Sequence, residues 1–210
     1  MLKKYKKKIL LIGAGGHAKA CIEVIENHKG DNFLISGLID KIKSNKTINN
    51  KYKVIGNDID LKSLKKKFNY AFVALGHIKK INLRKKIFKN LLSLGYKLPT
   101  FISKNSIVSK NSLIGKGTIV MNGVIINSNV SIGDNCIINT GSIFEHDVII
   151  GNNCHVAPGA ILNGGTKVED DCFIGSGSVI KENVKISKNS IVGANIFLRR
   201  NTLNNELIKK

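Results

Sequence analysis

The tripeptide Glu145-His146-Asp147 contains two side chains that could move a proton together. The imidazole of His146 has an ordinary pKa near neutrality, so it can accept a proton from an attacking nucleophile. An adjacent carboxylate can orient the ring and raise its basicity. The sequence therefore marks His146 as a candidate general base and Asp147 as its supporting carboxylate. The alternative is a surface histidine without a catalytic role.

A second candidate site begins at Gly13, where the residues G-A-G-G-H-A fit the pattern G-x-G-x-x-A of nucleotide-binding turns. Glycines let the backbone approach a ligand closely, and the N-terminus of the following helix favours phosphate. Asp40 lies 25 residues beyond Gly15, so NAD remains possible, although the turn suits the diphosphate of any nucleotide. His17 either adds a polar group to this site or only begins the helix.

Alternating strands and helices surround this turn in the first hundred residues. We expect strands over Lys8–Ile12, Phe33–Ile39 and Tyr70–Leu75, and helices from the turn to about Asn27, near Asp60–Phe68 and from about Lys79 to Leu94. This order predicts a small parallel sheet of the Rossmann type, whose ligands bind at the carboxyl ends of the strands. Those ends carry Gly15, Gly16, His17, Asp40, Lys41, Gly76 and His77.

Residues 101–202 divide into seventeen consecutive hexads without an insertion. The second residue is apolar in all of them, and the sixth is small in sixteen, with Ile196 as the exception. Stacked repeats are predicted, because each unit can bury its apolar residue only against its neighbours. Cys136, Cys154 and Cys172 lie 18 residues apart, so three hexads make one turn of a triangular coil. We predict a solenoid over 101–202 and a polar tail over 203–210.

The 18-residue period also predicts what lies next to the candidate base. One coil above His146 and Asp147 are Gly164 and Gly165, and one coil below His146 is Ser128. Two glycines would leave room for a reacting group, although glycines also serve ordinary corners with positive φ.

The first residue of each hexad should face outward, which gives three columns. Two of them are apolar: Phe101, Ile119, Ile137, His155, Phe173, Ile191 and Ile107, Ile125, Ile143, Ile161, Val179, Phe197. The third is more polar in its upper coils: Leu113, Ser131, Ile149, Lys167, Lys185. Two apolar faces are too much exposed surface for a monomer, so we predict a closed oligomer packed on both. His155 is then expected at a subunit boundary.

The formal charge of +20 is concentrated in residues 1–100, which hold a net +17. A basic domain could attract nucleic acid or a phosphorylated ligand. The basic runs 65–67 and 79–80 carry no interleaved aromatic residues, so we interpret them as solvated helix faces and expect no nucleic-acid partner. No apolar run approaches the roughly 18 residues needed to span a bilayer, and no signal pattern begins the chain. A cytoplasmic protein without membrane insertion is expected.

Three of the four cysteines occupy the small sixth position of their hexads. An interior ladder of thiols is expected, and no metal, because neither a C-x-x-C pair nor a matching pair of histidines accompanies them. The same absence argues against a zinc hydratase.

A GAGGHAK start, a short Rossmann-like domain and hexads with EHD followed by HVAPGA resemble the sialic-acid O-acetyltransferase and bacillosamine N-acetyltransferase family. The resemblance covers about residues 8–196. It implies a left-handed parallel β-helix over 101–202 that binds acetyl-CoA between the subunits of a homotrimer. It also implies that residues 1–100 hold a nucleotide-sugar acceptor.

By this resemblance His146 is the general base, Asp147 supports it, and His155 contacts acetyl-CoA. Gly164 is expected to leave room for the acetyl group, and further cofactor contacts are implied near Gly175, Ser176, Gly193 and Ala194. The family often ends its β-helix with G-V-P-A-K, whereas this chain has Phe197-Leu198-Arg199-Arg200. Arg199 and Arg200 could replace those contacts by charge.

The expected activity is acetyl-CoA-dependent acetylation of a nucleotide-linked amino sugar for surface glycan synthesis, with the amino group of a UDP-amino-dideoxysugar as acceptor. One alternative is O-acetylation of a sialic acid or a related sugar. Another is a non-catalytic nucleotide-binding or regulatory module, against which the pair of His146 and Asp147 argues. The sequence leaves the sugar open, and with it the choice between UDP, GDP and CMP.

Overall fold

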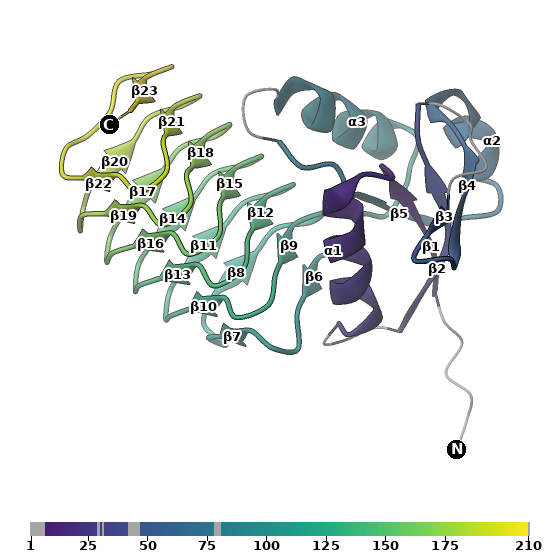
Figure 1. Ribbon diagram of the computed structural model, residues 1–210, viewed down its shortest axis with the longest axis horizontal. Coiled ribbons are helices and arrows are strands. Elements are labelled where there is room, and N and C mark those ends of the chain that lie inside the picture. The colour runs from purple at the N-terminus through teal and green to yellow at the C-terminus, as the bar shows by residue number, and fades with distance from the viewer. Residues whose placement is uncertain (1–6, 29, 31, 42–46, 78–80, 210) are drawn as a thin grey trace.

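The computed structural model describes residues 7–28, 30, 32–41, 47–77 and 81–209. An N-terminal α/β domain is followed by a long β-helix, and the domain lies against the first coils (Figure 1). The predicted fold class, a Rossmann-like domain before a left-handed parallel β-helix of hexapeptide repeats, is confirmed.

The α/β domain contains one five-stranded sheet in the order β3-β4-β2-β1-β5, parallel except for the pair β3 and β4. Its strands are β1 (Lys7–Ile12), β2 (Phe33–Ile39), β3 (Thr47–Ile48), β4 (Tyr52–Gly56) and β5 (Tyr70–Val73). Its helices are α1 (Gly16–Glu26), the 3-10 helix η1 (Asp58–Asp60), α2 (Leu61–Leu64) and α3 (Ile81–Ser93). The hairpin β3–β4 was not predicted, α2 is shorter than expected, and the predicted start of α3 at Lys79 lies outside the described residues.

Strand β1 shows why this sheet is covered on both faces. Successive side chains of a strand point to opposite faces, and four consecutive residues of β1 are almost fully buried. Ile9 and Leu11 join a core with α1 and the β-helix, while Leu10 and Ile12 join a second core with α2 and α3. The continuous apolar run of β1 therefore reflects burial on both sides.

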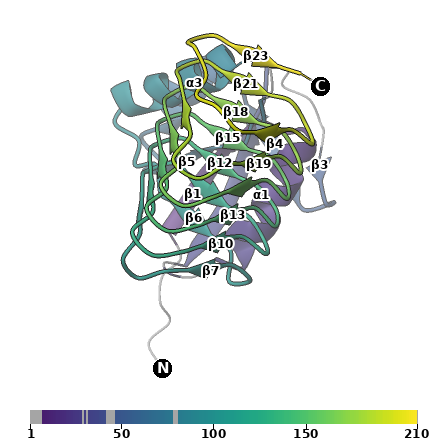
Figure 2. The same cartoon turned by 90° about the vertical axis from the view of Figure 1, so that its left-hand side faces the viewer.

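The β-helix consists of two-residue strands, each paired in parallel with the strand 18 residues further on, as between Ile125 and Ile143. Three faces result, and their coils stack as Figure 2 shows. The docked face holds β6 (Phe101–Ile102), β9 (Ile119–Val120), β12 (Ile137–Ile138), β15 (His155–Val156), β18 (Phe173–Ile174), β21 (Ile191–Val192) and β23 (Leu207–Ile208). The apolar face holds β7 (Ile107–Val108), β10 (Ile125–Ile126), β13 (Ile143–Phe144), β16 (Ile161–Leu162), β19 (Val179–Ile180) and β22 (Phe197–Leu198). The lysine face holds β8 (Leu113–Ile114), β11 (Ser131–Ile132), β14 (Ile149–Ile150), β17 (Lys167–Val168) and β20 (Lys185–Ile186).

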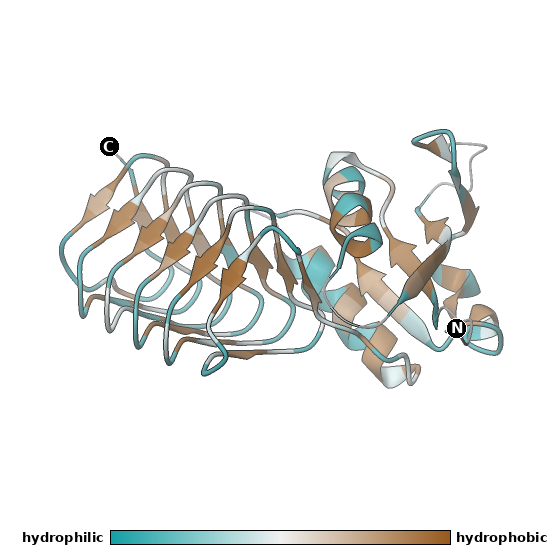
Figure 3. Ribbon diagram, turned by 90° about the horizontal axis from the view of Figure 1, so that it is seen from below, coloured by the Kyte–Doolittle hydropathy of each residue, from teal (hydrophilic) through white to brown (hydrophobic). Residues whose placement is uncertain are grey.

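The corners between these faces have a regular backbone that the hexad reading missed. From Gly117 to Asn195, the fifth residue of every hexad has positive φ, and each is glycine, asparagine or aspartate. These residue types tolerate the left-handed conformation. Hydrophilic corners alternate with hydrophobic strands along the β-helix in Figure 3.

One of the two predicted oligomer faces is covered by the chain itself. Phe101, Ile119 and Ile137, on the docked face, are fully buried beneath the α/β domain. The sequence pattern shows that a column is apolar but does not show what covers it, so this column was wrongly assigned to a subunit contact. Only the apolar face keeps an uncovered row, with Ile107 68% exposed and Phe197 54% exposed.

Two consecutive residues of α3 fasten the domain to the β-helix. Arg84 is buried and donates from Nη1 to the carbonyl oxygens of Val73 (2.5 Å) and Leu75 (2.8 Å), and from Nε to that of Asn135 (3.3 Å). Lys85 forms a 2.5 Å ion pair with Asp171. Between these two ends runs a ladder of amide bonds: Asn135 donates to Asn153, and Asn153 donates to Asp171, each at 2.9 Å. We call these contacts the α3 clamp.

The predicted polar tail also needs correction. Leu207–Ile208 form β23 and pair with Ile191–Val192 on the docked face. The tail thus adds a final strand to the docked face. Among the described helices, none is both long and apolar enough to cross a bilayer.

Candidate active site

His146 and Asp147 form a hydrogen-bonded pair at the corner between β13 and β14. The imidazole Nδ1 lies 2.8 Å from Asp147 Oδ2, and both side chains are more than half exposed. An ionised carboxylate can only accept hydrogen bonds, so Nδ1 carries the proton and Nε2 offers its lone pair. This is the arrangement expected of a general base.

The coil below and the coil above hold this corner in place. Asp147 has φ 62°, and its backbone NH donates to the carbonyl of Ser128 at 3.2 Å. The carbonyl of His146 accepts from the backbone NH of Gly165 at 3.0 Å. The dyad therefore sits on a backbone that its neighbours fix on both sides.

Asn129 is a site residue that sequence reasoning missed. Its side-chain amide donates to Asp147 Oδ1 at 2.5 Å. The hydrogen bond from His146, followed by that from Asn129, holds the pKa of Asp147 below its ordinary value. The available signal was the 18-residue spacing from Asn129 to Asp147. Glu145 stands apart from the dyad and accepts from Asn127 at 3.0 Å.

Gly164 lies directly over the imidazole, as the period predicts. A Cβ at this position would stand 2.7 Å from Cε1 and 2.8 Å from Nε2 of His146. Any other residue would therefore push the ring away or cover its basic nitrogen. A glycine here leaves the Nε2 side of the ring open to a reactant.

The four residues expected to extend the cofactor site lie at another corner. Gly175 and Ser176 follow β18, Gly193 and Ala194 follow β21, and the two pairs stack one coil apart. This corner joins the docked face to the apolar face, whereas His146 lies where the apolar face meets the lysine face. The structure thus brings the four together and separates them from the dyad by the width of the apolar face.

His155 does not lie at a subunit boundary, because the chain's own α/β domain covers it. Its side chain is 8% exposed. Nδ1 donates to the carbonyl of His77 at 2.6 Å, and Nε2 accepts from the amide of Asn139 at 3.2 Å. Burial lowers the pKa of this imidazole. Its contact with acetyl-CoA stays a prediction, and both ring nitrogens already have partners.

Gly15, Gly16 and His17 form the first turn of α1 at the carboxyl end of β1. Gly15 is the N-cap, and open space surrounds Gly15 and Gly16 where side chains would project. Gly76 lies beside His17, since a Cβ there would come within 3.4 Å of the histidine Cβ. The structure therefore brings the predicted turn and Gly76 together at one edge of the sheet.

Histidines 17 and 77 are unusual in this edge. His17 Nε2 and both ring nitrogens of His77 are buried without a hydrogen-bond partner among the described residues. Burial lowers the pKa of each imidazole to about 3, assisted for His17 by the nearby charge of Arg84 and for His77 by His155 and then Arg84. Both rings are consequently neutral at physiological pH.

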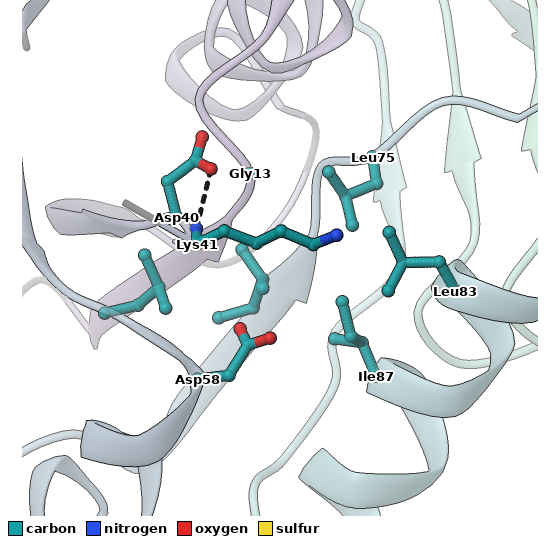
Figure 4. Close-up of a pocket in the computed structure, with 9 residues that line it drawn as sticks. Gly13, Asp40, Lys41, Asp58, Leu75, Leu83 and Ile87 are labelled. Atoms are coloured by element: carbon teal, nitrogen blue, oxygen red, sulfur yellow. Dashed lines mark hydrogen bonds between the residues drawn. The ribbon is translucent and has the colours of Figure 1, made fainter. Parts of the chain in front are cut away.

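Asp40 and Lys41 line a pocket at the ends of β1 and β2 (Figure 4). Asp40 is anchored, because Oδ2 accepts from the backbone NH of Ala14 at 2.9 Å and Oδ1 from that of Lys41 at 2.7 Å. The remaining lining includes Asp58, Leu75 and two residues of α3. No cluster of three or more metal-ligating side chains occurs in the part of the chain that the structure describes.

Three family models match successive parts of the chain. Residues 8–91 match the PglD N-terminal domain, residues 129–164 the bacterial transferase hexapeptide (six repeats), and residues 165–200 the hexapeptide repeat of succinyl-transferase. Among curated proteins, the sequence search found no match.

Solved structures resemble the chain over nearly its whole length. PerB from Caulobacter crescentus, in complex with CoA and GDP-perosamine, is 32% identical over 95% of this chain and 92% of that one, with a TM-score of 0.86. A histidine-to-asparagine variant of perosamine N-acetyltransferase from the same organism is 31% identical over 92% and 90%, with a TM-score of 0.82. The acetyltransferase domain of PglB from Neisseria gonorrhoeae, in complex with acetyl coenzyme A, is 26% identical over 97% and 96%, with a TM-score of 0.85.

Proposed function

The chain belongs to the NeuD/PglD-like family of hexapeptide-repeat sugar acetyltransferases, and on that premise we propose that it acetylates the amino group of a sugar linked to a nucleoside diphosphate. It is an acetyl-CoA-dependent sugar acetyltransferase. The observation that carries the proposal is the pair of His146 and Asp147 at an open corner, with only Gly164 above the ring. Amino over hydroxyl is supported by the perosamine N-acetyltransferase, which is 31% identical.

His146 acts as the general base. Acetyl-CoA supplies a thioester carbonyl carbon for attack by the sugar amine. Because Nδ1 is bonded to Asp147, Nε2 receives the amine proton as the C–N bond forms and the C–S bond breaks. The proton then passes to the departing sulfur. Asp147 keeps the ring in the required tautomer and stabilises the imidazolium, and Asn129 holds Asp147.

The acceptor site is proposed at the carboxyl edge of the α/β sheet. Gly15, Gly16 and His17 offer backbone amides and a helix N-terminus, which favour a diphosphate. Asp40, Lys41 and Gly76 lie at the same edge of the sheet. The net +17 charge of residues 1–100 favours an anionic acceptor.

The base and the acceptor site are proposed to come from different chains. Along each coil, the docked face is followed by the apolar face and then the lysine face. His146 lies between the last two, at the corner opposite the docked face and hence away from the chain's own α/β domain. An acceptor bound to that domain would reach His146 of a neighbouring copy.

The uncovered apolar face gives such a copy a place to pack. Its row from Ile107 to Phe197 is apolar in every coil. In a closed ring of three chains, a corner at one edge of this face meets the corner at the other edge in the next chain. His146 and Gly164 of one chain would then lie beside Gly175, Ser176, Gly193 and Ala194 of the next, with acetyl-CoA between them.

An acceptor screen tests the activity. The release of free CoA from acetyl-CoA would be followed with a thiol reagent against amino sugars and hydroxyl sugars linked to UDP, GDP and CMP. We expect turnover with an amino sugar and none after His146→Ala. Turnover only with sialic acid or another hydroxyl acceptor would replace N-acetylation by O-acetylation. Absence of CoA release with every acceptor would contradict the proposal.

A further inference from the structure

The pocket in Figure 4 has flat apolar walls and charged groups at one side. Leu75, which follows β5, and Leu83 and Ile87 of α3 form the walls. Lys41 and Asp58 approach from the opposite side, on the segments that follow β2 and β4. A planar ring that carries hydrogen-bond donors and acceptors on its edge fits this combination.

Gly13 connects this pocket to the proposed diphosphate site. It lines the pocket and stands two residues before Gly15, where α1 begins. A nucleotide whose diphosphate lies at that turn would direct its nucleoside into the pocket. The ring that enters is therefore a nucleobase, an argument that rests on the proposed function.

Asp58 is the carboxylate available to recognise that base. Both oxygens of Asp40 already accept backbone hydrogen bonds. Asp58, by contrast, has no hydrogen bond or ion pair within the described ranges, and in Figure 4 its carboxylate points into the pocket. A free carboxylate offers two acceptor oxygens and no donor.

We propose that Asp58 selects guanine, so that the acceptor is a GDP-linked amino sugar. Guanine presents two adjacent donors, N1–H and the 2-amino group, which match the two oxygens of a carboxylate. Uracil presents one N–H between two carbonyl oxygens, and those oxygens would face the carboxylate unfavourably. Adenine and cytosine each place a ring acceptor beside a single amino group. Lys41, a donor only, suits the guanine O6 next to N1. This base replaces the uridine expected from the family resemblance.

Calorimetry with free nucleoside diphosphates tests the selection without the sugar. Inosine diphosphate lacks the 2-amino group and otherwise matches GDP. Wild-type protein should bind GDP about 10-fold or more tightly than inosine diphosphate, as expected for loss of one hydrogen bond to a charged group, and more tightly than UDP. With Asp58→Asn, GDP binding should weaken and the difference between GDP and inosine diphosphate should fall below about 3-fold.

Glu182→Gln is the matched control, because it removes an exposed carboxylate of the β-helix that pairs only with Lys181 at 3.7 Å. It should leave all these affinities unchanged. Equal binding of GDP and inosine diphosphate by wild-type protein, tighter binding of UDP, or an unaltered preference after Asp58→Asn would overturn the assignment. If a UDP-linked amino sugar is acetylated, the proposed function stands and the role of Asp58 falls; if no nucleotide sugar is acetylated and no nucleotide binds, both fall.

Discussion

Replacement of Gly164 by alanine tests the catalytic dyad with one added methyl group. The Gly164 backbone lies outside the left-handed region, so alanine fits without backbone strain. Its Cβ would begin 2.7 Å from His146 Cε1 and 2.8 Å from Nε2, whereas ordinary contacts begin near 3.4 Å. The exposed imidazole must retreat or turn by this difference, away from the line of attack.

A misplacement of about 1 Å can lower turnover by about 100-fold, so we expect Gly164→Ala to reduce kcat by roughly 10- to 100-fold. Thermal stability should stay within about 2 °C of wild type, because the ring moves into solvent. The assay is CoA release at saturating acetyl-CoA and acceptor, together with a melting curve of each protein.

The same change in a His146→Ala background supplies the control. Once the imidazole is gone, Gly164→Ala should have little further effect, and the two losses should not add. Turnover of Gly164→Ala within about 2-fold of wild type would refute the placement of the base beneath this glycine. An equal loss in the His146→Ala background would show that the methyl group acts elsewhere.

Four further predictions follow from the structure. His146→Ala should lower kcat by about 100-fold or more with acetyl-CoA binding retained in calorimetry, and Asp147→Asn should cost less because the imidazole remains and asparagine accepts the same left-handed φ; a larger loss for Asp147→Asn would contradict this order. Ile161→Lys should abolish assembly and activity together, since it places an unpaired charge in the proposed interface, and sedimentation showing an active monomer would rule that interface out. Gly16→Val should raise the acceptor KM strongly and leave acetyl-CoA affinity unchanged, so intact nucleotide-sugar binding would argue against the turn. Stability should fall as the pH drops from about 6.5 towards 3, because the unfolded chain then binds protons that buried His77, with its pKa of about 3, refuses; His77→Gln should flatten the dependence of the melting temperature on pH, and an unchanged slope would exclude His77 as its source.

The β-helix could be predicted almost completely because its signal is repeated in every hexad. One apolar residue per hexad fixes the buried side, and the 18-residue recurrence of cysteine fixes the coil. The same recurrence placed Gly164 over His146 before any coordinates. It also contained Asn129 beneath Asp147, which was overlooked because the amide matters only through its contact with the carboxylate.

Long-range contacts account for what the sequence did not reveal. An apolar column looks the same whether the chain's own domain or a second chain covers it, which is why Phe101 and Ile119 were misassigned. The polar His155 within that column is explained by a hydrogen bond to a backbone carbonyl 78 residues away. The hairpin β3–β4 contains a strand of only two residues, too short for a period to be visible.

The α3 clamp bears on the order in which the chain can fold during synthesis. Arg84 and Lys85 belong to a domain that leaves the ribosome first, whereas their partners extend from Asn135 to Asp171. Domains tend to fold as units from the N-terminus as synthesis proceeds. The α/β domain must therefore wait, with the side of α1 that will meet the β-helix still wet, until the ribosome has added the later coils. A ribosome stalled before residue 171 would display a folded but undocked domain, which limited proteolysis of stalled chains would detect as cleavage between α3 and the β-helix.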